Sequence, residues 1–164
     1  MDFNSMENHA KNIRENILRM ITKAGSGHPG GSLSIVEILT VLYFDKMNID
    51  KKNLKNKDRD RFVLSKGHAA PGLYSVLIEK GIIGKENIDT LRQIDSILQG
   101  HPDMKSTPGI DMSTGSLGQG LSAANGMALV GKITNQNYNV YSIIGDGECQ
   151  EGQIWEAAMA AAHY

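Results

Sequence analysis

The sequence has little of what would mark a secreted, membrane-spanning or nucleic-acid-binding protein. Its single cysteine, Cys149, cannot form a disulfide within the chain, so we expect a reducing, cytoplasmic compartment. No apolar run approaches the roughly 20 residues of a membrane span, and the amino-terminal residues lack the apolar region of a signal peptide. The formal net charge of −1 gives no electrostatic footprint for nucleic acid.

Proline is also scarce, whereas glycine is abundant. The 164 residues include 4 prolines and 18 glycines, and 40% of the residues are hydrophobic. This length and composition predict one globular domain with a buried core. Because glycine is in excess without low complexity, we expect several places where backbone segments approach closely.

The apolar spacing predicts helices that alternate with two short strands. Helices are expected at 6–24, 35–44, 71–81, 86–97, 121–133 and 151–163, and strands at 62–64 and 140–144. The 35–44 helix is apolar on most faces and is expected to be buried. Strands separated by long helical segments indicate an α/β fold, with a parallel sheet flanked by helices.

Both predicted strands run directly into polar loops that contain glycine. The loop after the first strand is Ser65-Lys66-Gly67-His68, and the loop after the second is Gly145-Asp146-Gly147-Glu148. Ligands of parallel sheets bind at the carboxyl ends of the strands. The sequence therefore predicts a site where these two loops meet.

Three of the five histidines follow a glycine: His28, His68 and His101. They come from different loops, and glycine lets an imidazole approach a ligand without a neighbouring side chain in the way. Imidazole also donates and accepts protons near neutral pH. Convergence in one site is the favoured interpretation. Separate surface histidines and a three-histidine zinc site remain alternatives.

The Gly145-Asp146-Gly147 loop has the chemistry of a metal and diphosphate site. Asp146 can give one hard oxygen to Mg²⁺, which binds few carboxylates and completes its shell with phosphate oxygens. The glycines let backbone N–H groups approach a diphosphate, next to the amino end of the following helix. The same tripeptide also occurs as a common turn, so the loop by itself does not name a reaction.

Five segments, taken together and in order, resemble the amino-terminal domain of transketolases. They are SGHPGGSLSIVEIL (26–39), DRFVLSKGHAAPGLY (60–74), QGHPD (99–103), STGSLGQGLSAANGMAL (113–129) and GDGECQEGQIWEAAMAAAHY (145–164). The resemblance covers nearly the whole chain. It implies that residues 1–164 are the amino-terminal part of a thiamine diphosphate-binding domain, in the form of a separately encoded subunit.

The resemblance implies an enzyme that uses thiamine diphosphate and Mg²⁺ or Ca²⁺. Such enzymes transfer a two-carbon ketol unit from a ketose phosphate to an aldose phosphate, in the pentose phosphate pathway. The implied partner is a complementary carboxy-terminal transketolase subunit, and the heteromer is expected to dimerise. Nucleic acid and membrane partners are not expected.

The resemblance also implies roles for individual residues. Asp146 would ligate the metal, while Gly145, Gly147 and His68 would contact the diphosphate. Cofactor-binding residues for the aminopyrimidine would be Gly115, Ser116 and Leu117. His28 and His101 would act on substrate oxygens, as catalytic residues.

Two acidic residues after the metal loop, Glu151 and Glu156, would belong to a proton network between paired sites at a subunit interface. First-turn acids that complement a helix dipole remain the alternative for both. Trp155 and Met159 are expected in the core, and Cys149 is expected to be inert packing.

The chain departs from the family pattern because it lacks the strand, and the asparagine on it, that complete the metal site in family members. We therefore expect a truncated domain that binds thiamine diphosphate weakly and does not turn over alone. A non-catalytic fragment that pairs with a transketolase, and a related enzyme such as 1-deoxy-D-xylulose-5-phosphate synthase, remain alternative functions.

Overall fold

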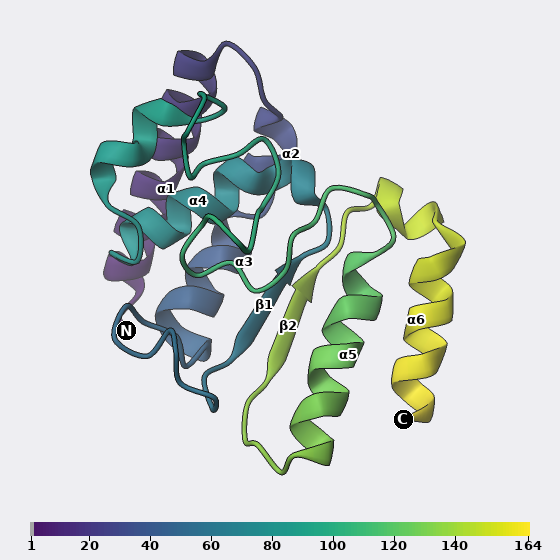
Figure 1. Ribbon diagram of the computed structural model, residues 1–164. Helices are drawn as coiled ribbons and strands as arrows, with labels where there is room; N and C mark the ends of the chain where they lie inside the picture. Colours follow the sequence, from purple (N-terminus) through teal and green to yellow (C-terminus); the bar gives the residue numbers. More distant parts are fainter. Residues whose placement is uncertain (1) are drawn as a thin grey trace.

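A two-stranded parallel sheet lies between two groups of helices (Figure 1). The computed structural model describes residues 2–164. Its α-helices and strands are α1 (Phe3–Ala24), α2 (Pro29–Leu33), α3 (Val36–Val41), β1 (Arg61–Leu64), α4 (Ala70–Glu79), α5 (Gly120–Ile133), β2 (Val140–Ile143) and α6 (Gly152–His163). Shorter turns are η1 (Leu42–Lys46, π-helical) and the 3-10 turns η2 (Gly67–Ala69), η3 (Lys85–Thr90) and η4 (Gly147–Gln150).

The two strands pair in parallel, as the sequence predicts. Arg61 pairs with Val140 and Leu64 with Ile143, so both strands end at the same edge of the sheet. Ser65 N–H donates to the carbonyl of Ile143 at 2.9 Å and extends this pairing by one residue. The loops that follow β1 and β2 therefore start side by side, which confirms the predicted α/β fold class and places the two polar loops together.

The main core lies on the α1–α4 side of the sheet. The buried stripe of α1 is Ala10, Ile13, Ile17 and Met20, the spacing of one helix face. It packs against α4, whose residues from Ala70 to Ile78 are all buried. From the sheet, Phe62 and Leu64 join this core, and the Tyr43 ring meets Phe62 edge-on at 5.5 Å. Val63, between them, is equally buried but points to the opposite face, toward α5.

The predicted helix at 86–97 is wrong beyond its first residues. Only the 3-10 turn Lys85–Thr90 forms, and Arg92 and Asp95 have positive φ angles, which a right-handed helix does not tolerate. The backbone turns back instead, because Arg92 N–H donates to the Leu98 carbonyl at 2.9 Å. This loop buries Leu98 and Leu91, a long-range gain that outweighs the local helical preference.

The predicted buried helix at 35–44 is correct only in part. The α-helix is limited to Val36–Val41, and the π-helical η1 continues it to Lys46. Val36 and Leu39 are fully buried, but Ile38 and Val41 are 51% and 43% exposed. One face therefore packs on the core and the other remains open. The short helix α2 was not predicted from the sequence.

The expectation that Trp155 and Met159 belong to the core is wrong. They are 63% and 66% exposed, because α6 packs on α5 through Ile154 and Ala157 instead. The indole N–H of Trp155 donates to the carbonyl of Cys149 at 2.9 Å. Cys149 itself is exposed, so its expected packing role is also wrong.

Across residues 2–164, no helix has the length and apolar character needed to cross a membrane.

Candidate functional site

A hollow of about 420 Å³ lies at the carboxyl ends of β1 and β2. In Figure 1, the segment before α5 passes this end of the sheet, next to the turn that leads into α6. The lining comes from helix α2 with its C-cap and from three loops that the fold brings together. It consists of Gly30, Gly31, Ser34, Lys66, His68, Leu117, Gly145, Asp146, Gly147 and Glu148. Both loops that the sequence placed at the strand ends contribute to it.

Two glycines stand where chain segments around the hollow approach each other closely. A Cβ on Gly67 would lie 2.7 Å from the backbone nitrogen of Gly115, and one on Gly31 would lie 3.2 Å from the His68 ring. The first distance is shorter than any side chain tolerates, and the obstacle is backbone. The close backbone approaches that the glycine content suggested therefore occur around the hollow.

The three Gly-His motifs converge around His68. The rings of His28 and His68 meet edge-on with centroids 5.2 Å apart. The His101 ring lies beside Gly115, 3.2 Å from the position of a Cβ there. Burial lowers the pKa of His68 below its ordinary value of 6.5, and the electrostatic influence of His28, Lys66 and His101 lowers it further. His68 lines the hollow, whereas the exposed His28 contacts the His68 ring and the exposed His101 lies beside Gly115.

Lys66 is a member of the site that was not predicted from the sequence. It is 7% exposed, and its ammonium group donates to the Ser34 hydroxyl at 3.2 Å. Burial lowers the pKa of Lys66 below its ordinary value, and the nearby charges of Asp146 and Glu148 offset this effect only in part. The available signal was its position between a strand end and a Gly-His pair. Its positive charge faces the same hollow as Asp146.

Glu148 is the second residue that sequence reasoning missed. It is 2% exposed, and its carboxylate accepts hydrogen bonds from the Ser65 hydroxyl and from the backbone N–H groups of Gly118 and Gly145. The donors come from three loops of the site. The only signal for this role in the sequence was that an acidic residue directly follows the Gly-Asp-Gly turn.

The residues expected to hold the aminopyrimidine divide between two hollows. Gly115 and Ser116 line a second hollow of about 310 Å³, whereas Leu117 lines the first. The Thr114 hydroxyl beside them is buried and has no hydrogen-bond partner within the described chain. A buried polar atom without a partner is a position where a ligand group can bind.

Glu151 and Glu156 lie on the exposed surface of α6 and its amino end. Glu151 occupies the N-cap position without a side-chain capping bond, and no acidic residue stands in the first turn. The alternative role as a first-turn acid is therefore wrong for Glu156, whereas Glu151 lies at the amino end of α6, where a carboxylate complements the helix dipole. Both side chains are exposed, as an interface role requires.

A three-histidine zinc site is also wrong. Among residues 2–164, no group of three or more histidine, cysteine, aspartate or glutamate side chains is placed to hold a metal ion. Asp146 is exposed at the hollow and offers one carboxylate. This donor set fits a hard divalent cation that takes its remaining ligands from a bound phosphate, because Mg²⁺ commonly binds through one or two carboxylates.

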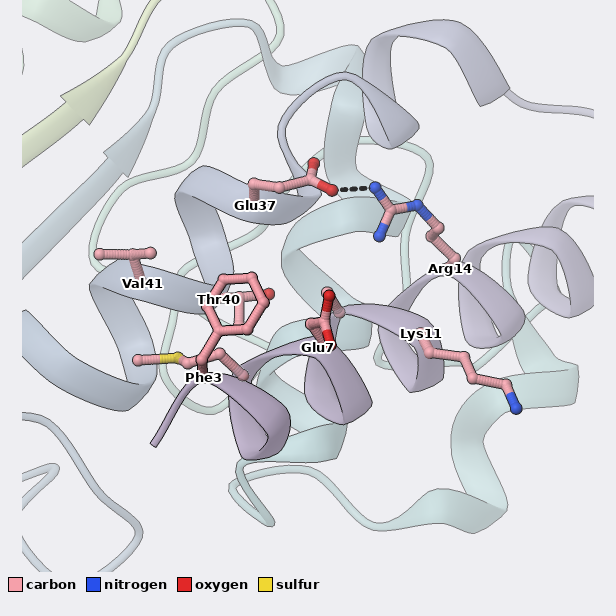
Figure 2. A pocket seen from close by; sticks show the side chains of 9 residues that line it. Phe3, Glu7, Lys11, Arg14, Glu37, Thr40 and Val41 are labelled. Atoms are coloured by element: carbon pink, nitrogen blue, oxygen red, sulfur yellow. Dashed lines mark hydrogen bonds and ion pairs between the residues drawn. The ribbon is translucent and has the colours of Figure 1, made fainter. Parts of the chain in front are cut away.

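A larger hollow of about 570 Å³ lies between α1 and α3, away from these loops (Figure 2). Phe3 and Val41 line it, and an ion pair between Arg14 and Glu37 stands at one side. None of the residues that line it belongs to the Gly-His motifs or to the Gly-Asp-Gly loop of the described chain. Size alone therefore does not identify the chemical site.

Residues 5–164 match the protein family described as transketolase, thiamine diphosphate binding domain. The chain is 53% identical over 156 residues to the 6-deoxy-6-sulfo-D-fructose transketolase subunit SqwG of Clostridium sp. (strain MSTE9), covering 95% of this chain and 57% of that protein. It is 44% identical over 164 residues to one of the subunits of the apulose-4-phosphate transketolase of Phocaeicola vulgatus, covering 100% of this chain and 58% of that protein.

Comparison of structures leads to the same family. The structure superposes on transketolase from Campylobacter jejuni with a TM-score of 0.91 and 34% identity, over 99% of this chain and 27% of that one. The chain thus spans somewhat more than half of the two subunit relatives and about a quarter of this longer transketolase. By these matches the chain belongs to the transketolase family, through the thiamine diphosphate binding domain that its residues 5–164 match.

Proposed function

We propose that residues 1–164 supply the diphosphate- and metal-binding part of a two-subunit transketolase. One observation carries the proposal: Lys66, His68 and Asp146 line a single hollow at the carboxyl ends of two parallel strands. That hollow combines a buried positive charge, an imidazole and a carboxylate with open glycine backbone. These groups are complementary to a diphosphate with a divalent cation.

In this proposal Lys66 and His68 bind the diphosphate, and Gly145 and Gly147 border it with backbone. A Cβ on Gly147 would meet nothing within 4 Å, so its backbone is accessible from the hollow. Asp146 gives one oxygen to Mg²⁺ or Ca²⁺. The metal has no complete ligand set in the described chain, so phosphate oxygens and further groups must complete it.

The second hollow, of about 310 Å³, is proposed for the aminopyrimidine ring. Gly115 and Ser116 line it, and the next residue in the chain, Leu117, lines the diphosphate hollow. The buried hydroxyl of Thr114 supports this assignment, because a polar ligand group would satisfy it. The two hollows together match a ligand that has an aromatic end and an anionic end.

The proposed reaction transfers a two-carbon ketol unit from a ketose phosphate to an aldose phosphate. When bound, thiamine diphosphate supplies the carbon nucleophile and the electron sink for this chemistry. His28, in contact with the His68 ring, and His101, beside Gly115, are proposed to hydrogen-bond substrate oxygens and to move protons there. Such general acid–base assistance typically contributes 10²–10⁴-fold.

A complementary subunit is part of the proposal. Two relatives are named as subunits of transketolases, and the chain spans just over half of each. Glu151 and Glu156 are exposed on and beside α6, so they are available to a partner surface. We propose that they connect paired sites in a dimer of the assembled heteromer.

We assign the sugar donor of this function by its chemical class. The names of two relatives specify 6-deoxy-6-sulfo-D-fructose and apulose 4-phosphate, rather than a sugar of the pentose phosphate pathway. The donor preference of this chain is therefore assigned only as a ketose with an anionic end. Xylulose 5-phosphate, 6-deoxy-6-sulfofructose and apulose 4-phosphate are the three donors to compare.

Calorimetry tests the cofactor part on the chain itself. Thiamine diphosphate with Mg²⁺ should bind at least tenfold more tightly than thiamine, which has no diphosphate for Lys66 and His68 to contact. Equal affinity for the two would contradict the proposal.

Ketol transfer is then assayed after addition of a carboxy-terminal transketolase subunit. Cofactor binding without any transfer would favour a non-catalytic fragment, and pyruvate consumption would favour the deoxyxylulose phosphate synthase reaction.

A further inference from the structure

The Glu148 carboxylate joins three loops of the site. It accepts from the Ser65 hydroxyl at 2.5 Å and from Gly118 N–H at 3.0 Å, both on Oε1, and from Gly145 N–H at 2.9 Å on Oε2. Glu148 lies in η4, directly after the metal loop. The three donors are far apart in the sequence, so one side chain holds together loops that only the fold brings into contact.

Each of these loops carries residues that the proposed function uses. Ser65 precedes Lys66 and His68, Gly118 follows the aminopyrimidine segment, and Gly145 precedes Asp146. A carboxylate offers only acceptors, so it can satisfy three donors at once. Without it, two backbone N–H groups would remain buried and unpaired, a state that proteins almost always avoid.

The occupied oxygens distinguish Glu148 from a ligand-binding group. Its side chain borders the hollow but is only 2% exposed, and both oxygens already bind donors within the chain. The other acidic residue of the hollow, Asp146, is exposed and available to a cation. The carboxylate of Glu148 therefore binds groups of the three loops and has no oxygen left for a cofactor.

We propose that Glu148 is a positioning residue, which fixes the relative placement of the three loops and thereby sets the affinity of the site for diphosphate. This inference rests on the proposed function. Its consequence is that a change at Glu148 weakens binding of diphosphate with or without a metal. A metal ligand would behave differently, because its loss weakens only metal-dependent binding.

The test uses the full chain and the variant Glu148→Gln. The amide is isosteric, but its NH₂ group must face at least one backbone N–H, at Gly145 or at Gly118. Calorimetry measures the affinity for inorganic pyrophosphate without metal and for thiamine diphosphate with Mg²⁺. Both dissociation constants should rise about tenfold or more, as expected when a hydrogen bond to a charged group is replaced by opposed donors.

Hydrogen exchange provides a readout that needs no ligand. The amide protons of Gly118 and Gly145 should exchange at least tenfold faster in Glu148→Gln than in the wild type. The exposed residue Glu15, which pairs with Lys11 on the same helix, gives the matched control. Glu15→Gln removes the same charge and should change neither exchange at these two glycines nor pyrophosphate affinity.

Ser65→Ala is the milder variant, and by itself it should raise the dissociation constant for pyrophosphate, which decides the matter if Glu148→Gln does not fold. It removes one donor to the carboxylate and leaves both backbone donors in place. Where Glu148→Gln folds, the effects of the two substitutions on pyrophosphate affinity should be less than additive in the double variant, because both break the same contact. Additive effects, or a lowered melting temperature with unchanged affinity of the folded protein, would overturn the positioning role.

The outcomes separate this inference from the proposed function. If the wild-type chain binds neither pyrophosphate nor thiamine diphosphate, the proposed function fails. If the wild type binds both and Glu148→Gln binds them equally well, only the positioning role fails. If Glu148→Gln loses Mg²⁺-dependent binding alone, Glu148 is a metal ligand and the inference is wrong.

Discussion

The His28 ring meets the His68 ring edge-on, with centroids 5.2 Å apart. This contact joins the loop before α2 to the loop after β1 and places two imidazoles at one side of the diphosphate hollow. The pair is not equivalent, because His68 lines the hollow and is half-buried while His28 is exposed. This difference in exposure is the reason why we propose a cofactor contact for His68 and a substrate contact for His28.

The first prediction concerns the protonation of His68. Burial lowers its pKa in the folded chain, so its imidazole should titrate below pH 6.5 in the ligand-free protein. Because the folded chain protonates His68 less readily than the unfolded chain, the contribution of His68 to the free energy of unfolding is fully present above about pH 6.5. It is lost as the pH falls through the pKa of the folded state. Pyrophosphate should shift this titration upward, because an anion favours the protonated ring.

Nuclear magnetic resonance of the histidine ring protons measures this titration, with His68→Gln used for assignment. Urea unfolding at pH 7.5 and pH 5.5 measures the stability effect, which should be smaller in His68→Gln than in the wild type. A ring that titrates at or above pH 6.5 without ligand would contradict the prediction.

The second prediction concerns Lys66. Lys66→Met keeps the length of the side chain but removes the charge that faces the hollow, so pyrophosphate affinity should fall about tenfold or more. The stability of the ligand-free chain should not fall in parallel, because burial of the ammonium is itself unfavourable and lowers its pKa. Lys52→Met, in the exposed charged loop, is the matched control for calorimetry and thermal unfolding.

The third prediction separates cofactor binding from turnover. Asp146→Ala should abolish the Mg²⁺-dependent part of thiamine diphosphate binding, because it removes the carboxylate that the hollow offers to a cation. His28→Ala should instead lower turnover of the assembled enzyme by about 10²–10⁴-fold with little effect on cofactor affinity. Calorimetry and a coupled ketol-transfer assay distinguish them. The reverse pattern would mean that the two roles are misassigned.

The fourth prediction contrasts two glycines. Gly67→Ala places a Cβ 2.7 Å from the backbone of Gly115, so the loops must separate, at a cost of about 1–3 kcal/mol in the free energy of unfolding. Gly126 lies within α5, where a Cβ meets nothing within 4 Å. Gly126→Ala should therefore stabilise by about 0.5–1 kcal/mol. Urea denaturation measures both, and equal effects would refute the close-approach argument.

The local patterns of the sequence were sufficient to predict most of the regular structure. The apolar stripe of α1, the proline in the first turn of α4 and the short apolar strand β1 each act over neighbouring residues, and each forms as predicted. The segment 86–97 fails because its outcome depends on burying Leu91 and Leu98 against residues far along the chain. Trp155 was misplaced for a related reason, since hydrophobicity does not specify which face of α6 meets α5.

The sequence by itself determined the fold class, the family resemblance and the loops that carry the chemistry, because these depend on periodicity and on motifs that are contiguous in the chain. Only the tertiary structure placed Lys66 inside the hollow and gave Glu148 its three donors. The reason is physical. Burial and hydrogen bonding of a charged side chain depend on groups that the fold brings from distant loops, and no local pattern records which groups those are.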